Sequence, residues 1–223
     1  MSLKAQLDAC RRAFEASTPP GIVAALAGSV AELVQTGLVR QAVKAGERAP
    51  LFRLRSNTGD FVSLSEALDR GPVVVSFFRG GWCPFCRLEL QALAEAHSEI
   101  ERLGATLIAL SPQARGKSAS LGSGCEPPFP ILRDLGCKIA SRYRIAFTVR
   151  HQFRAAYLEL GYPNSTKAKS WLLSIPATYV LDSSGFVVVS YLDADHTTRL
   201  EPTEIIAALT HLRAVDIPDR NNR

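Results

Sequence analysis

Hydrophobic residues in this chain recur with two different periods, one typical of strands and the other of helices. Short runs that are almost entirely apolar and rich in β-branched residues occupy positions 73–78, 106–110 and 177–181, and predict buried strands. Residues 87–103, between the first two runs, predict an amphipathic helix. Its apolar positions are Leu90, Leu93, Ala96, Ile100 and Leu103.

Further patterns extend this core in both directions. Residues 52–62 alternate around an Asn-Thr-Gly-Asp turn and predict a hairpin, while residues 186–191 predict the hairpin partner of the strand at 177–181. Helical periodicity at 201–212 predicts a last helix with Ile205, Ile206, Leu209 and Leu212 turned inward, and shorter helices are expected at 137–143 and 151–160. Residues 1–45 predict two helices separated by Pro19 and Pro20.

The order strand, helix, strand, helix, hairpin, helix predicts an α/β fold with a central mixed sheet flanked by helices. The strands at 73–78 and 106–110 are joined by a long helix and should be parallel. We expect three parts: an N-terminal helical extension at 1–45, a main domain at 46–215 and a short tail at 216–223.

Composition narrows the classes of function only slightly. The chain has 223 residues, 47% of them hydrophobic and 21% charged, with a net charge of +5. Because its lysines and arginines are scattered, we interpret them as a solvated surface and expect no nucleic-acid partner.

Two segments at the N-terminus resemble targeting signals. Residues 21–39 are mostly apolar, but Glu32 interrupts them, so a buried or amphipathic helix is expected and not a membrane span. The pair Arg11-Arg12 is similar to an export signal, yet Glu15 and the prolines that follow do not fit one. Five cysteines, an odd number, suit a reducing compartment, and we expect a cytoplasmic protein with no membrane contact.

The most informative motif is Trp82-Cys83-Pro84-Phe85-Cys86-Arg87, which lies between the predicted strand at 73–78 and the following helix. The first turn of a helix has free backbone N–H groups and a positive dipole end, both of which favour a thiolate over a thiol. A C-x-x-C at this place therefore predicts redox-active cysteines.

The chain resembles the alkyl hydroperoxide reductase/thiol-specific antioxidant group, the peroxiredoxin-like branch of the thioredoxin superfamily. The matching segments are Gly46-x-x-Ala49-Pro50-x-Phe52, residues 74–86, Phe129-Pro130-Ile131-Leu132-x-Asp134 and residues 175–182. This resemblance implies a thioredoxin-like fold and a thiol-dependent oxidoreductase in redox homeostasis or antioxidant defence, with no cofactor and no metal.

The chain departs from that family at its active-site motif. In the register Pro-x-x-x-Thr-x-x-Cys, Arg79 replaces the proline, Cys83 replaces the threonine and Cys86 takes the peroxidatic position. The family's active-site arginine corresponds to Pro176, which leaves Arg79 as a candidate for the missing charge. The turn Ile175-Pro176-Ala177 is instead similar to the thioredoxin turn that faces the C-x-x-C, which implies a cis peptide bond before Pro176.

Two mechanisms follow, and each forms a Cys83–Cys86 disulfide. The preferred hypothesis is dithiol–disulfide exchange, in which the more exposed Cys83 attacks a substrate disulfide and Cys86 resolves it. The alternative is a hydroperoxide reductase, in which Cys86 is oxidised and Cys83 resolves it, with a thioredoxin-type or other thiol electron donor. Trp82, Pro84 and Phe85 are expected to shape the site together with Arg79, Ile175 and Pro176.

A structural or zinc-binding pair is a minor alternative, since no second C-x-x-C or histidine pair supplies the remaining ligands. Cys125 is an alternative resolving thiol, and Cys10 and Cys137 are expected to be packed. The four histidines, His97, His151, His196 and His211, are expected to be solvated. Trp171 is expected either to line the site or to belong to the core. The N-terminal helices are expected either to pack across the main domain or to form a homodimer.

Overall fold

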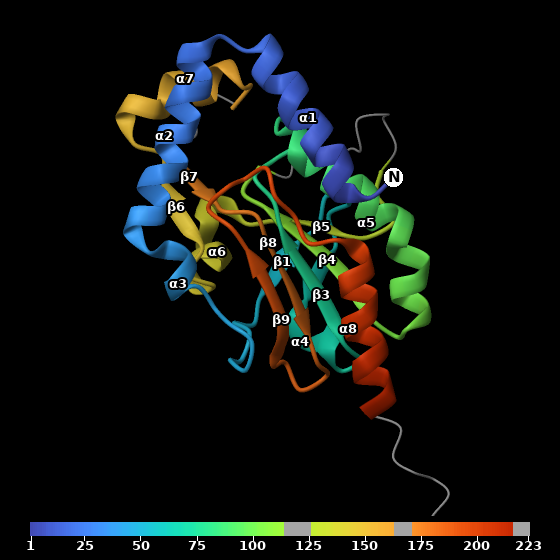
Figure 1. Ribbon diagram of the computed structural model, residues 1–223. Helices are drawn as coiled ribbons and strands as arrows, with labels where there is room; N and C mark the ends of the chain where they lie inside the picture. The colour runs from blue at the N-terminus through green and yellow to red at the C-terminus, as the bar shows by residue number, and fades with distance from the viewer. Residues whose placement is uncertain (114–125, 163–170, 216–223) are drawn as a thin grey trace, which may run out of the picture.

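The computed structural model describes residues 1–113, 126–162 and 171–215 (Figure 1). Within them, a five-stranded sheet has the order β5-β4-β3-β8-β9. Its strands are β3 (Val73–Phe77), β4 (Thr106–Ser111), β5 (Ile131–Arg133), β8 (Ala177–Leu181) and β9 (Val187–Leu192). Strand β3 is parallel to β4 and antiparallel to β8, so the sheet is mixed and the predicted α/β class is confirmed.

Strand β3 is buried on both faces, because helices cover the sheet from both sides. Val74 packs with residues of α5 (Pro84–Arg102) and α8 (Pro202–Val215), two helices that lie side by side in Figure 1. Val73 and Val75 belong to the opposite core, together with residues of α4 (Leu64–Leu68) and α6 (Lys138–Arg142). The long helix α5 connects β3 to β4, as its apolar spacing predicts.

Most of the smaller elements also follow the sequence pattern. The first hairpin consists of β1 (Arg53–Arg55) and β2 (Phe61–Ser63), and β8 pairs with β9 as expected. The short helical segments are η2 (Leu135–Cys137), α6, η3 (His151–Phe153) and α7 (Arg154–Glu159). The three-residue strands β5, β6 (Ala146–Thr148) and β7 (Leu172–Ser174) were not predicted, because so few residues show no recognisable period. Cys125 and the expected tail at 216–223 lie outside the described residues.

The N-terminal segment forms α1 (Leu3–Ser17), α2 (Pro20–Thr36) and α3 (Leu38–Gln41). Helix α2 ends earlier than expected, because Gly37 adopts a left-handed conformation at its C-terminus (φ 67°). Helix α1 packs on α5, and α2 packs on α7 and η3, so both helices lie across one end of the sheet (Figure 1). The expectation that these helices pack across the main domain is therefore confirmed.

The start of α1 is held by a side chain from the other end of the chain. Glu201 accepts hydrogen bonds from the backbone N–H of Lys4 (2.7 Å) and of Leu3 (3.2 Å). A carboxylate at this place satisfies free N–H groups and complements the helix dipole. Among the helices of the described residues, none is both long enough and apolar enough to cross a membrane.

Candidate active site

The two cysteines lie where the sequence places them, at the first turn of α5. Cys83 is the N-cap residue and Pro84 is the first helical residue, a position at which proline is favoured because its missing N–H has no helical partner. Both thiols are free. Cys83 is 2% exposed and Cys86 is fully buried, so Cys83 is the more exposed of the two as expected, but neither thiol is open to solvent. The reason is tertiary: α1 packs across α5 and its apolar face closes over this turn.

Arg199, from the segment between β9 and α8, provides the main positive charge at the thiols. Its Nη2 donates a hydrogen bond to Cys86 Sγ at 3.2 Å. Its Nη1 donates to the backbone carbonyls of His196 (2.7 Å) and Thr198 (2.6 Å), and its Nε pairs with Glu89. The guanidinium is thus fixed by four partners before any substrate arrives.

Glu89 completes this buried network from α5, three residues after Cys86. Its carboxylate accepts hydrogen bonds from the hydroxyls of Ser76 on β3 and Thr178 on β8, each at 3.4 Å. Burial raises the pKa of Glu89 to about 7, although the adjacent Arg199 opposes the shift. Two strands and the active-site helix therefore hold the carboxylate that orients Arg199.

A second arginine, Arg79, follows β3 and is only 1% exposed. Its guanidinium lies 4.9 Å from the ring centroid of Tyr157 and 5.3 Å from that of Trp82, within the range of cation–π interactions. Its Nε and Nη1 have no hydrogen-bond partner among the described residues. A buried guanidinium with free donors next to a thiol pair is a candidate for binding a negatively charged oxygen or sulfur.

The two thiols hydrogen-bond to each other, so they titrate as a pair. Burial alone would raise the pKa of Cys83, but the hydrogen bond from Cys86 and the charges of Arg79 and Arg199 lower it to about 6. Burial and the neighbouring Cys83 raise the pKa of Cys86 well above that of an ordinary thiol. The pair therefore carries one thiolate at neutral pH, and the second proton stays bound.

His196 also belongs to the site, and the expectation that it is solvated is wrong. Its ring packs edge-on against Phe85 at 5.7 Å, and it lines a small cavity together with Cys83, Arg79 and Trp82. Burial, followed by the charges of Arg79 and Arg199, lowers the pKa of His196 well below its usual value. A neutral imidazole therefore borders the thiol pair.

The turn at Pro176 does not have the expected thioredoxin geometry. No cis peptide bond occurs in the described residues, so the peptide bond between Ile175 and Pro176 is trans. The expectation of a cis bond before Pro176 is therefore wrong. The trans isomer is the intrinsically favoured one, and Ile175 N–H is already satisfied by the carbonyl of Ile145 at 3.0 Å. Both Ile175 and Pro176 line a cavity with Arg79, so they border the site without forming that turn.

The remaining candidates are packed. Cys137 is fully buried in the core on the opposite face of the sheet from the thiol pair, and Cys10 is partly buried on α1, as expected. Trp171 stacks on Tyr162 at 4.9 Å, and Tyr162 in turn contacts Trp82 at 5.8 Å, so Trp171 extends the aromatic wall behind Trp82. In the described part of the chain, no three His, Cys, Asp or Glu side chains gather as metal ligands would.

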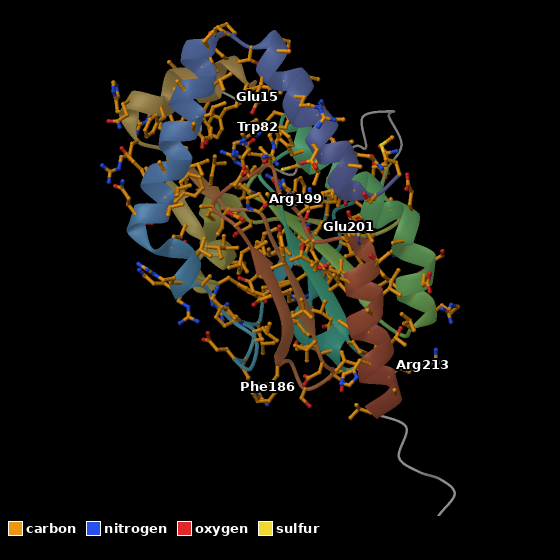
Figure 2. The ribbon with its side chains drawn as sticks, in the orientation of Figure 1. Glu15, Trp82, Phe186, Arg199, Glu201 and Arg213 are labelled. Carbon is orange, nitrogen blue, oxygen red and sulfur yellow. The ribbon has the colours of Figure 1, made fainter. Side chains whose placement is uncertain are left out.

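Sequence reasoning missed both Arg199 and Glu89. Glu89 had a readable signal: it is a carboxylate on the buried stripe of a helix, between Cys86 and Leu93. Arg199 had none, because it is one of many scattered arginines. Figure 2 labels Trp82 and Arg199, which come from segments far apart in the sequence.

Known proteins share sequence similarity with part of this chain. A model of the AhpC/TSA family matches residues 45–190. Peroxiredoxin Q of Oryza sativa subsp. japonica, a chloroplastic protein, is 30% identical over 46% of this chain and 47% of its own length. The corresponding protein of Triticum aestivum is 27% identical over 49% of this chain and 50% of its own. The chain thus spans about half the length of these curated relatives.

Solved structures confirm the thioredoxin-like fold. Peroxidoxin BcpB from Mycobacterium tuberculosis superposes with a TM-score of 0.59 at 21% identity, covering 78% of this chain and 98% of the other. The peroxiredoxin 6 of Arenicola marina gives a TM-score of 0.61 at 17% identity, covering 80% of this chain and 79% of the other. Since the family model covers more than half of the sequence, the chain belongs to the AhpC/TSA family.

Proposed function

We propose that this protein is a thiol-dependent hydroperoxide reductase in which Cys86 attacks the peroxide and Cys83 resolves the product. The observation that carries the proposal is the hydrogen bond from Arg199 to Cys86 Sγ at 3.2 Å. Pro176 stands where the family has its active-site arginine. In this chain Arg199, from another segment, supplies the positive charge beside the reacting sulfur. A guanidinium fixed beside the reacting sulfur stabilises the negative charge that develops on the peroxide oxygens.

The proposed reaction balances with the groups present. The two thiols share one proton, and the attack starts from the state in which Cys83 holds that proton and Cys86 is the thiolate. The Cys86 thiolate attacks one peroxide oxygen, the O–O bond breaks, Cys86 becomes a sulfenic acid, and the proton of Cys83 passes to the leaving oxygen, which departs as an alcohol or water. Cys83, now a thiolate, attacks the sulfenic sulfur, the hydroxyl group leaves as water with a proton from the solvent, and the Cys83–Cys86 disulfide forms. An external dithiol returns two electrons and two protons by thiol–disulfide exchange.

Disulfide exchange with Cys83 as the attacking thiol is the second candidate. Cys83 lines the small cavity and is the N-cap of α5, and its pKa is lowered to about 6. Two features favour peroxide instead: both thiols are almost completely buried, and the Pro176 turn is trans, so no thioredoxin-like turn faces a peptide. These two features therefore favour hydroperoxide reduction over disulfide exchange, which is the preferred hypothesis from the sequence alone.

The variants Cys83→Ser and Cys86→Ser test both candidates in a paired assay. In Cys83→Ser, a pulse of hydrogen peroxide should leave a sulfenic acid on Cys86 that a trapping reagent labels and mass spectrometry locates. Cys86→Ser should lose peroxide consumption. Reduction of a protein disulfide that survives in Cys86→Ser but not in Cys83→Ser, with no sulfenate on Cys86, would establish disulfide exchange instead. Cys137→Ser is the matched control, since Cys137 is buried in the other core.

We extend the proposal to partners and compartment. A thioredoxin-type dithiol protein is the proposed donor, because the Cys83–Cys86 disulfide is reduced when an external thiolate attacks one of its sulfurs and a second thiol releases the mixed disulfide. Oxidation of the donor, followed in the presence of peroxide, tests this role. A homodimer is also proposed, and sedimentation velocity of the full chain decides it. The free thiols suit a reducing compartment, and we propose the cytoplasm.

A further inference from the structure

Both tryptophans of the chain belong to a row of aromatic rings that starts at the thiol pair. Trp82 is the residue before Cys83 and borders the same small cavity. The ring of Tyr162 contacts that of Trp82 at a centroid distance of 5.8 Å, and Trp171 stacks on Tyr162 at 4.9 Å with 13° between the ring planes. Both distances are those of direct aromatic contact. The row therefore leads from Cys83 to Trp171 through rings that each touch the next.

The two ends of this row differ in exposure. Cys83 is 2% exposed and Cys86 is fully buried, and the cavity beside Cys83 has a volume of about 10 Å³, roughly the room that one water molecule needs. An oxidant larger than this cavity cannot touch either sulfur. Trp171 and Trp82, in contrast, are both partly exposed. Such an oxidant can therefore meet the rings although it cannot meet the thiols.

The groups in the row share one chemical property. Tryptophan, tyrosine and thiolate are the side chains that give up a single electron most readily, and rings in contact exchange electrons rapidly. Cys83 and Cys86 together carry one thiolate at neutral pH, and the thiolate is the form of cysteine that is most easily oxidised. An electron taken from Trp171 can thus be replaced from Tyr162, then from Trp82, and finally from the thiol pair.

The charges along the row set the direction of this transfer. The guanidinium of Arg154 lies 4.9 Å from the ring centroid of Trp171, and that of Arg79 lies 5.3 Å from the centroid of Trp82. A positive charge beside a ring disfavours a radical cation on it. Trp82 Nε1 has no hydrogen-bond partner among the described residues, so no acceptor takes its proton to leave a neutral radical there. The electron vacancy is therefore better stabilised on the negatively charged thiolate than on either tryptophan.

We propose that this row of rings carries single electrons from the Cys83–Cys86 pair to one-electron oxidants, diffusing free radicals that react with Trp171 at the surface. The protein would then have a second activity, the reduction of radicals that cannot enter the thiol cavity. The inference goes beyond the proposed peroxidase function, because it needs only the reduced thiol pair and the rings.

The electrons and protons of this reaction balance with dioxygen as the second acceptor. The radical takes one electron from Trp171, and transfer through Tyr162 and Trp82 moves the vacancy to the thiolate, which becomes a thiyl radical. The thiyl sulfur bonds to the other sulfur, whose proton leaves to the solvent, and a disulfide radical anion forms. Dioxygen takes the extra electron and departs as superoxide, and the Cys83–Cys86 disulfide remains. The pair loses two electrons and one proton: one electron reduces the radical, and the other reduces dioxygen.

Pulse radiolysis of the full chain tests the transfer. Azide radicals oxidise tryptophan in preference to other side chains, so they start the reaction in the row. In the reduced protein without oxygen, the absorbance of the tryptophan radical should decay at a rate independent of protein concentration, while the band of the disulfide radical anion rises. In the double variant Cys83→Ser/Cys86→Ser that band should be absent, and the tryptophan radical should last several times longer.

Tyr162→Phe tests the route, because it keeps the stacked ring but removes the group that is oxidised. Radicals formed on Trp171 should then form a slow fraction that lasts several times longer than in the wild-type protein. The slow fraction should vanish in Tyr162→Phe/Trp171→Phe, which assigns it to Trp171. Tyr157→Phe is the matched control: Tyr157 branches from Trp82 at 6.4 Å, and its substitution removes the same hydroxyl group without interrupting the row. Circular dichroism checks that each variant is folded.

The outcomes separate this inference from the proposed function. A tryptophan radical that lasts equally long with and without the two thiols would refute the inference, as would equal decays in Tyr162→Phe and Tyr157→Phe. The comparison with the double serine variant decides the matter even if Tyr162→Phe does not fold. Absence of the transfer in a protein that reduces hydrogen peroxide removes this inference alone. The predicted transfer in a protein that does not reduce peroxide supports the inference and removes the proposed function alone.

Discussion

Arg199 Nη2 donates a hydrogen bond to Cys86 Sγ at 3.2 Å, although the two residues are separated by 113 positions in the sequence. The contact joins the start of α5 to the segment that leads into α8. Glu89 holds the same guanidinium through its Nε, so the position of the charge depends on the fold and not on the substrate. Such preorganised charge costs no rearrangement when the peroxide bond breaks.

Replacing Arg199 tests this relationship directly. Arg199→Ala should lower kcat/KM for hydrogen peroxide by about 10²–10³-fold, the usual effect of removing one preorganised donor. Arg199→Lys keeps the charge but not the forked donor geometry, and should recover only part of the rate. Because Arg199→Ala leaves Glu89 buried without its partner, circular dichroism must show that the variant is folded. A folded variant with the wild-type rate would remove Arg199 from the mechanism.

The shared thiolate makes a prediction about pH. Ultraviolet absorbance of the thiolate should rise with a midpoint at about pH 6, as should the rate of reaction with peroxide. Arg79→Gln should move the midpoint upward, because the charge of Arg79 lowers the pKa of Cys83.

Folding lowers the pKa of Cys83 from 9.0 to about 6, so the native protein binds fewer protons than the unfolded chain between these values. This contribution to stability is therefore complete above pH 9 and is lost as the pH falls through 6; a midpoint that stays near 9 would contradict the assignment.

Glu89 should have the opposite dependence. Folding raises the pKa of Glu89 from 4.5 to about 7, so the native protein binds more protons than the unfolded chain in that window. Its contribution to the free energy of unfolding is complete below pH 4.5 and is lost as the pH rises through 7. In Glu89→Gln this slope should disappear from the pH dependence of denaturant unfolding.

Relative to the wild-type protein, Glu89→Gln should therefore be least stable at low pH, and its deficit in unfolding free energy should shrink as the pH rises through 7. Ser76→Ala is the control: it removes one 3.4 Å hydrogen bond to Glu89, keeps the carboxyl group, and should cost about 1 kcal/mol while retaining the pH slope. A deficit of Glu89→Gln that stays constant between pH 5 and pH 8 would contradict the raised pKa of Glu89.

Gly80 should not tolerate a side chain. Its φ is 148°, and a Cβ there would meet Trp82 Nε1 at 2.6 Å and Gln113 Oε1 at 2.9 Å. Gly80→Ala should cost about 1–3 kcal/mol of unfolding free energy and displace Trp82, which a shift in tryptophan fluorescence would report. Gly21→Ala is the control, because nothing lies within 4 Å of its added Cβ and helix α2 should be stabilised by up to about 1 kcal/mol. Equal effects of the two substitutions would exclude a steric cause at Gly80.

The central unit of the fold could be predicted because its signals are local. Strand β3, helix α5 and strand β4 each bury a face that repeats within a few residues, and the thiols follow from a motif at the start of a helix. The C-x-x-C of Cys83 and Cys86 therefore lies at the start of α5, as the sequence predicts. Short strands such as β6 and β7 were missed, since three residues carry no period and their pairing depends on distant partners.

The sequence by itself determined that this is an α/β protein with a reactive thiol pair at the start of a helix. Only the tertiary structure decided that Arg199 supplies the charge, that both thiols are buried, that Pro176 is trans, and that Trp82, Tyr162 and Trp171 lie in contact. The physical reason is that periodicity and helix termini are properties of neighbouring residues. Charge pairing, burial and cavities depend instead on which distant segments the packed sheet brings into contact.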